Sequence, residues 1–361
     1  MAVKASGQLT FTEIGDEFGL APNPSGSGYS LGAYRISQTV ASLSNLGLDN
    51  NQNNPPTSIM PQGNSTIRMS DFYSKKLNTV VDLHSSDQNN TTRKDIRNRY
   101  NGNNVTVIGG FRSKPTDTGE KPPTGVRGKR VIGLINVTIG SERSTNKSRC
   151  AVQTGTWDAN TTFEVHIGDD GEILGAGGSG GNGGGCGNGN APNDATSALG
   201  IEQSGTKVIN NGYIQCGYGG GGGGGTASCD PDKSTNDPIA PGGGGGAGAG
   251  YPSGPGGAGA CDSGGCGGNG GNGGNKTRGA GGSGIVDGCA TGGTGGNGGQ
   301  PGSAAQDGGD GNSTYGADCE KEGGTPGYNG DAIRSTVSSG NVTIVNAGTI
   351  HGGQVYSTTV S

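Results

Sequence analysis

The sequence predicts a mainly β and irregular fold. A small N-terminal helical docking segment and a β-rich middle domain precede a C-terminal polyglycine II helix bundle closed by short β-hairpins. Glycine accounts for 83 of the 361 residues, and 61 of these glycines lie between residues 171 and 330. Stretches rich in β-branched residues occupy much of the chain before residue 168. The hydrophobic fraction is only 27%, which is too low for one large apolar core.

Residues 1–77 are expected to form a small attachment module. In the stretch LTFTEIGDEFG, Thr10 and Glu13 have the spacing of a capping box, and the apolar residues that follow fall on one helix face. Gly19 then ends the predicted helix. Ser70 is a candidate N-cap for a second short helix.

Residues 78–168 are expected to form a β-rich spacer domain. Its candidate strands alternate or are β-branched, and turn residues separate them. These strands are residues 78–84, 104–110, 129–140, 148–155 and 161–168. The single tryptophan, Trp157, is expected to pack in the core of this sheet, with a sugar-stacking platform as the alternative.

Residues 169–338 contain the glycine runs. The stretch GGNGGNGGN (267–275) places glycine at two of every three positions, and residues 177–185 and 292–302 follow the same phase. A three-residue repeat matches the polyproline II helix, which polyglycine can adopt. Several such helices side by side can satisfy each other's backbone groups, provided that glycine stands wherever two helices touch. A disordered Gly/Asn linker is the alternative; a calcium-binding β-roll is not favoured, because no series of its repeats follows.

Three stretches share a second pattern of a short β-branched strand, a turn ending in glycine and another short strand. They are residues 161–178, 205–220 and 339–354. Asn-Gly suits tight hairpin turns, so we expect β-hairpins that start or seal the glycine layer, including a C-terminal hairpin over residues 339–361.

The eight cysteines all lie at or beyond residue 150. Irregular spacing and only three histidines argue against zinc, and disulfides are favoured over unpaired thiols in a region with few apolar side chains. The disulfide candidates are Cys150, Cys216, Cys229, Cys186, Cys261, Cys266, Cys289 and Cys319. Eight cysteines allow 105 pairings, so the connectivity stays open.

Composition excludes several classes of function. The net charge of −5 is spread along the chain without a basic stripe, which argues against nucleic acid. No apolar run approaches a membrane span, and the N-terminus lacks a secretory h-region, so synthesis in a cytoplasm is expected. We find no enzyme signature and expect neither a cofactor nor a metal. The acidic stretches at residues 168–172 and 230–237 are better explained as turn and loop sequences than as metal sites.

The chain resembles glycine-rich bacteriophage tail-fibre receptor-recognition proteins over nearly its full length. The stretches LTFTEIGDEFG and MPQGNSTIRMSDFY are similar to a module of phage tail proteins. The stretch TTFEVHIGDDGEILGAGGSGGNGG is similar to the strand-and-glycine sequence of the distal adhesins in this family. The eight cysteines and the long loop 303–326 depart from the family pattern.

This resemblance implies a virion tail-fibre adhesin whose loops between glycine runs bind a bacterial surface receptor, either a glycan or an outer-membrane protein. Other tail or fibre proteins would be its partners, and a homotrimer is one open possibility. Exposed aromatic and charged residues on these loops are the candidate contacts. They are Tyr218, Asp232, Lys233, Tyr251, Lys276, Arg278, Tyr315 and Tyr328. The alternatives are a purely structural virion part, such as a collar or baseplate fibre, and an ice-binding or cell-surface glycine-rich protein.

Overall fold

A computed structural model describes most of the chain from residue 130 onward and short segments before it. The described residues are 6–10, 48–50, 75–77, 79–83, 94–96, 130–157, 161–185, 187–229, 238–262, 265–314 and 317–360. Within these ranges the named elements are β-strands and one short 3-10 helix, Ser339–Asn341, which confirms a mainly β and irregular fold. The helices predicted within residues 1–77 lie outside the described residues. Of this part of the chain the structure describes the strands β1 (Leu48–Asn50) and β2 (Lys75–Leu77), which pair antiparallel. The described part has no helix of the length and hydropathy that a membrane crossing needs.

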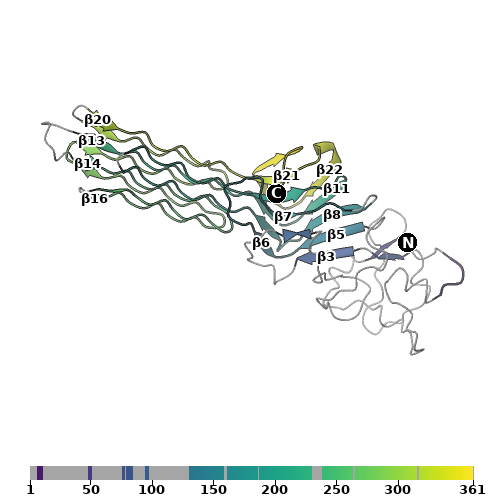
Figure 1. The fold of residues 1–361 in the computed structure, drawn as a ribbon. Helices are drawn as coiled ribbons and strands as arrows, with labels where there is room; N and C mark the ends of the chain where they lie inside the picture. The colour runs from purple at the N-terminus through teal and green to yellow at the C-terminus, as the bar shows by residue number, and fades with distance from the viewer. Residues whose placement is uncertain are drawn as a thin grey trace, which may run out of the picture.

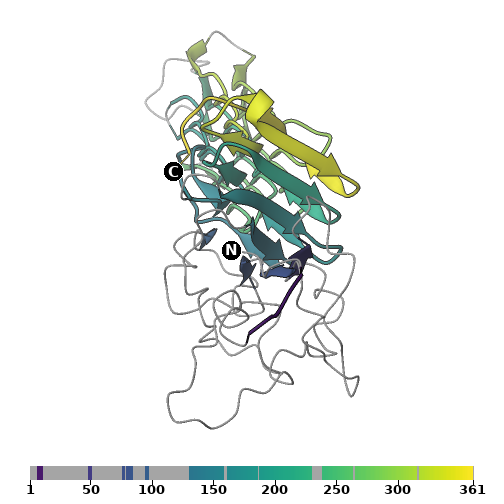
Figure 2. The same cartoon turned by 90° about the vertical axis from the view of Figure 1, so that its right-hand side faces the viewer.

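Three parallel sheets form a three-sided body, which we call the prism (Figures 1 and 2). The first sheet contains β3 (Thr79–Leu83), β5 (Arg130–Ile135), β8 (Thr162–Ile167), β11 (Thr206–Asn210) and β22 (Val342–Asn346). The second contains β6 (Thr138–Gly140), β9 (Glu172–Leu174), β12 (Tyr213–Gln215) and β23 (Thr349–His351). The third contains β4 (Lys94–Asp95), β7 (Cys150–Gln153), β10 (Ser197–Ile201), β21 (Asp331–Ser335) and β24 (Gly353–Val355).

The chain winds around the prism and adds one strand to each sheet per turn, as in β5–β6–β7 and β22–β23–β24. Equivalent residues of successive turns therefore stack, and Ile132 lies beside Glu164, which in turn lies beside Lys207. The expected hairpins are wrong, because the two strands of each predicted hairpin belong to different sheets. Their Asn-Gly and Asp-Gly turns form corners of the prism, and each strand pairs in parallel with the next copy of the repeat. Residues 339–355 form the last turn of the prism rather than a separate hairpin.

The prism interior is the apolar core of the described chain. Alternate residues of the strands point inward, among them Val165, Val208 and Ile333, all fully buried. Trp157 joins this core, 5% exposed, with its ring stacked on that of Phe163 at a centroid distance of 5.2 Å. Its indole Nε1 donates to the carbonyl oxygen of Thr154 at 2.9 Å. The side chain is therefore a packing element and offers little surface for stacking a sugar.

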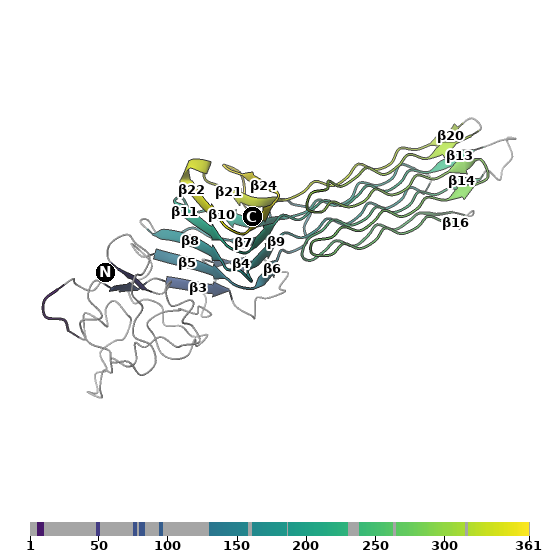
Figure 3. The same cartoon turned by 180° about the vertical axis from the view of Figure 1, so that it is seen from behind.

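Extended glycine-rich segments leave one corner of the prism, between its second and third sheets. They leave after β9 and β12 and return to β10 and β21 (Figures 1 and 3). We call these segments runs and their assembly the glycine bundle. The runs are residues 175–184, 189–196, 217–226, 241–250, 253–260, 267–275, 279–285, 292–299, 304–311 and 321–330. Successive runs point in opposite directions. The turns between them therefore alternate between the end of the bundle beside the prism, which we call the base, and the far end, which we call the distal end.

Backbone hydrogen bonds with a period of three hold the runs together. Run 241–250 donates to three neighbouring runs and accepts from three others. Towards one neighbour Gly242, Gly245 and Gly248 donate to Gly184, Gly181 and Gly178, at 3.1, 2.7 and 3.0 Å. Towards another Gly243, Gly246 and Ala249 donate to Gly293, Gly296 and Gly299, at 3.0, 2.8 and 2.9 Å. Every residue of this run is buried, so the run lies at the centre of the bundle and its backbone is satisfied without side chains.

Close approach between the runs explains the glycines. A Cβ atom added to Gly245 would overlap the backbone carbonyl of Gly221, with the carbonyl carbon at 2.7 Å. The residue at the third position faces outward, and it also has a partner. The Asn269 side-chain oxygen accepts from the Gly259 amide at 2.9 Å, and Asn272 does the same for Gly256 at 3.0 Å. Asparagine therefore completes the backbone pairing at the edge of the bundle, where no further run follows.

The cysteines fall into two groups. Cys261 and Cys266 form a disulfide, as expected, and Cys289 is also disulfide-bonded. For Cys150 and Cys216 the prediction is wrong, because both are buried thiols outside any disulfide. Both lie in or beside the prism, where apolar packing surrounds them. Cys186 and the side chains of Cys229 and Cys319 lie outside the described part of the chain.

Candidate functional site

Short strands cap the glycine bundle at its distal end (Figures 1 and 3). The strands β13 (Ala227–Cys229), β14 (Ile239–Ala240) and β20 (Ala317–Glu320) form one antiparallel sheet. A second contains β17 (Val286–Asp287), β18 (Ala290–Thr291) and β19 (Asn312–Ser313), and β15 (Cys261–Asp262) pairs with β16 (Gly265–Cys266) alone. These strands continue the runs, and segments far apart in sequence lie side by side, as β13 and β20 do.

A very small core lies beneath these strands. Ala227, Ala240 and Ala290 are fully buried against one another, with Cys289 packed beside them. Methyl groups suffice because the backbones of neighbouring runs are too close for larger side chains. Backbone hydrogen bonds supply the rest: Lys321 donates to Thr226 at 3.0 Å, and Thr314 donates to Cys289 at 2.9 Å. The distal turns are therefore held by the same backbone pairing as the runs below them.

Among the described residues of the distal end, Val286 is the most exposed large apolar residue. Its side chain is 71% exposed on β17, beside Asp287 and the turn residue Gly288, which has φ of +55°. The side chain contributes little to the protein's own core, and a partner that buried it would gain the free energy of that burial. Sequence reasoning missed this residue because it favoured aromatic and charged side chains. Its place at the turn between two consecutive runs was the signal that could have found it.

Three of the predicted contact residues belong to segments that start and end at the distal end. Asp232 and Lys233 lie between β13 and β14, and Tyr315 lies between β19 and β20. The three residues themselves lie outside the described residues. Their assignment stays a prediction that the flanking strands make reasonable.

The exposure expected for Tyr218 is wrong. Its side chain is 7% exposed, packed with Cys216 and Ala249 where run 217–226 enters the bundle. The sequence indicated no core that could bury it, but the stacked backbones of the bundle do so. Burial raises the pKa of this phenol well above its ordinary value. Tyr218 is therefore a packing residue at the point where this run enters the bundle.

Lys276 lies at the base, in the turn between runs 267–275 and 279–285. Its ammonium group contacts the Glu172 carboxylate at 2.6 Å and lies 4.1 Å from the ring centroid of Tyr213. Asn275 of the same turn accepts from the Gln215 side chain at 2.8 Å. Burial, and then the negative charge of Glu172, raise the pKa of Tyr213 to about 12. These contacts fasten the bundle to the outer face of the second sheet.

The structure places the other predicted residues near the base as well. The Tyr251 carbonyl accepts from the Ser141 amide of the prism at 2.9 Å. The Arg278 amide donates to the side chain of Gln300, in the next turn at the base, at 3.2 Å. Tyr328 is 72% exposed, but it lies close to β21, and its amide donates to Asp194 at 2.9 Å. The predicted set is therefore divided between the two ends of the bundle.

Within the described ranges, no group of three or more histidine, cysteine, aspartate or glutamate side chains is placed to hold a metal ion. Asp169 and Asp170 are exposed in the corner between β8 and β9, in keeping with a turn sequence. The acidic stretch 230–237 lies outside the described residues. Among the described residues, the distal end presents short paired strands and the exposed side chain of Val286.

Comparison with known proteins gives a family match. The family model described as phage tail fibre adhesin Gp38 matches residues 125–355, which include most of the prism and the whole glycine bundle. The chain is also similar to a chain in the crystal structure of the gp37-gp38 adhesin tip complex of the bacteriophage S16 long tail fiber. The two are 17% identical with a TM-score of 0.40, over 98% of this chain and 100% of that chain. No curated protein matches the sequence.

Proposed function

Because the chain belongs to the phage tail fibre adhesin Gp38 family, we propose that the distal end of its glycine bundle contacts the receptor on the host bacterium. The protein is a virion adhesin, and an adhesin needs a surface that extends away from the particle. One observation carries the choice of surface. The distal strands lie at the end of the bundle farthest from the prism, whereas β3 and β4, which come earliest in the chain among the prism strands, pair with β5 and β7 of the prism (Figure 3).

We infer that each run is a left-handed polyglycine II helix with three residues per turn. Donors of run 241–250 address the same neighbour every third residue and three neighbours in rotation. A threefold screw produces this pattern, whereas a β-strand addresses only two sides. In this interpretation the bundle is a stiff support, and the receptor would meet turns whose positions are fixed before binding. Such preorganisation favours affinity, because less conformational entropy is lost on contact.

Recognition would depend on the described residue Val286 and on the loops holding Asp232, Lys233 and Tyr315. The opposite end would attach to other tail fibre proteins, with residues 1–77 as the docking module. A bacterial glycan or an outer-membrane protein would be the receptor. Binding of this kind needs no catalysis, and we propose a non-enzymatic role.

An adsorption-blocking assay tests the proposal. Host cells are preincubated with purified protein, phage is added, and the unadsorbed phage is counted. Wild-type protein should block adsorption, and V286D should need about tenfold more protein for the same effect, because a charge replaces an apolar contact. V345D is the matched control, since Val345 is 48% exposed on β22 of the prism.

Two outcomes would contradict the proposal. Failure of folded wild-type protein to block adsorption would leave a fibre component without a receptor. Equal blocking by V286D and V345D would contradict the distal position of the contact surface.

A further inference from the structure

The pair β15–β16 differs from the other distal strands. It forms a two-stranded sheet of two residue pairs, Cys261 with Cys266 and Asp262 with Gly265. The neighbouring distal sheets have three strands each and share the alanine core, whose residues all belong to β13, β14 and β18. The pair β15–β16 therefore depends on its own cross-links for a fixed position.

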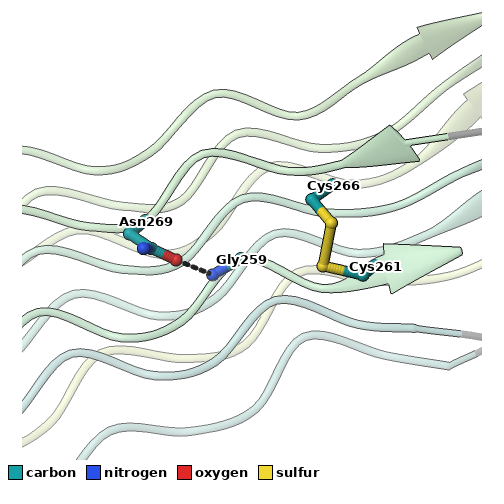
Figure 4. Close-up of a disulfide and its surroundings, with 4 residues drawn as sticks. All are labelled: Gly259, Cys261, Cys266 and Asn269. Atoms are coloured by element: carbon teal, nitrogen blue, oxygen red, sulfur yellow. Dashed lines mark hydrogen bonds between the residues drawn. A yellow bond between two sulfur atoms is a disulfide. The ribbon is translucent and has the colours of Figure 1, made fainter.

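On the side of this strand pair that faces the base, runs 253–260 and 267–275 are paired with each other along the edge of the bundle. The Gly267 amide donates to Ala260 at 2.7 Å, and the Asn269 side chain accepts from the Gly259 amide at 2.9 Å (Figure 4). The disulfide joins the two chain segments next to these bonds, on the side of the distal end. Beyond the disulfide the described residues add the single pair Asp262–Gly265, and Gly265 has φ of +140°. Without the disulfide, the pair β15–β16 would gain conformational freedom that the bundle does not restrict.

Resting on the proposed function, we infer that the Cys261–Cys266 disulfide fixes the strand pair β15–β16 as part of the receptor-contacting surface, so that full receptor binding requires its oxidised state. Both cysteines are exposed, so small thiols and disulfides in solution reach them. Cys150 and Cys216 are buried in the proximal part of the molecule and are shielded from the same reagents. A reagent in solution therefore reaches the Cys261–Cys266 pair without reaching Cys150 or Cys216.

The step is thiol–disulfide exchange. A thiolate of one cysteine attacks a small-molecule disulfide and releases one thiolate; the second cysteine then attacks the mixed disulfide and releases the other. Two protein thiols are oxidised, one small disulfide is reduced to two thiols, and the protons pass to water. A bacterial cytoplasm, where virion proteins are made, keeps thiols reduced, whereas the medium after lysis is oxidising. The adhesin would thus gain its full affinity for the receptor only after it leaves the cell.

The test compares wild-type protein with C261S/C266S for binding to cells of a strain that the phage infects. Each protein is measured before reduction, after reduction with a phosphine, and after reoxidation with glutathione disulfide. Oxidised wild type should bind about tenfold more tightly than the reduced protein, since ordering the pair β15–β16 would otherwise oppose binding. Reoxidation should restore this affinity. The double variant should bind weakly in all three states, and its unfolding should show an intact bundle.

Mass spectrometry after alkylation keeps the test independent of the variant's folding. In reduced native wild type, Cys261 and Cys266 should be labelled and Cys150 and Cys216 should not. Tight binding by the double variant contradicts the inference. So does a loss of wild-type binding on reduction that the double variant does not reproduce. In either case the redox effect belongs to another cysteine, such as Cys289. Wild type that binds no cells in any state contradicts the proposed function itself, together with this inference.

Discussion

The side-chain oxygen of Asn269 accepts a hydrogen bond from the backbone amide of Gly259 at 2.9 Å, across two neighbouring runs (Figure 4). The same relationship joins Asn182 to Ala258 and Asn297 to Gly281, both at 2.9 Å. Asparagine at every third position is thus part of the backbone network of the bundle. A short side chain with a carbonyl oxygen can replace the missing neighbour at an edge.

The substitution N269A should lower the free energy of unfolding by about 0.5–1.5 kcal/mol, because the Gly259 amide loses its acceptor. Denaturant unfolding measures the change. S283A is the control, since Ser283 is exposed at a third position and its side chain has no hydrogen-bond partner among the described residues. Equal stability of both variants would show that water replaces the asparagine at no cost.

G245A should destabilise the bundle by about 1–3 kcal/mol or more, because the new methyl group overlaps the backbone of Gly221. G271A is the matched control within the same bundle. A Cβ atom there has its nearest neighbour, the Ala280 amide nitrogen, at 3.2 Å, so a small shift accommodates it. Thermal unfolding should rank G245A well below G271A. The reverse order would contradict the packing of run 241–250 at the centre.

Stability should decline as the pH rises from about 9 towards 12. Burial raises the pKa of the Cys216 thiol from 9.0 to about 12, and burial raises that of the Tyr213 phenol from 10.0 to about 12. Both groups have a higher pKa in the folded than in the unfolded protein. Their contribution to the free energy of unfolding is therefore complete below the unfolded pKa values and is lost as the pH approaches the folded ones. Denaturation midpoints between pH 8 and 11 measure it. C216A should flatten the decline, whereas an unchanged slope would assign it to other groups.

Lys276 should stabilise the base without taking part in receptor binding. K276A removes a partly exposed ion pair with Glu172 and a cation–π contact with Tyr213, which together contribute about 1 kcal/mol. Unfolding should show this small loss, and adsorption blocking should match wild type. V286D should behave in the opposite way. If K276A blocked adsorption poorly while remaining folded, the receptor surface would extend to the base.

The sequence was informative where a pattern repeated over long distances. The glycine phase in residues 267–275 predicted side-by-side runs that need no apolar core. The position of Lys276 could also have been derived, since runs of similar length that alternate in direction place every second turn at the base. Turns holding Lys276 and Val286 are consecutive and therefore lie at opposite ends.

The predicted hairpins failed for a physical reason. Asn211-Gly212 favours a tight turn, but turn chemistry does not decide whether the next strand pairs with the previous one or bends into another sheet. That choice depends on the stacking of three repeats, which are separated by the whole glycine bundle. Tyr218 failed because burial by stacked backbones leaves no apolar pattern in the sequence.

The insertion of the bundle at one corner of the prism also bears on folding kinetics. Strands β12 and β21 belong to the same turn of the prism, yet runs 217–226 to 321–330 intervene between them. The last sheet strands can therefore pair only after this long excursion has returned, which gives the protein a high contact order and slow folding. During that interval the edges of β11 and β12 are unpaired and open to misassociation. A factor that covers these edges during that interval is therefore expected to raise the yield of folded adhesin.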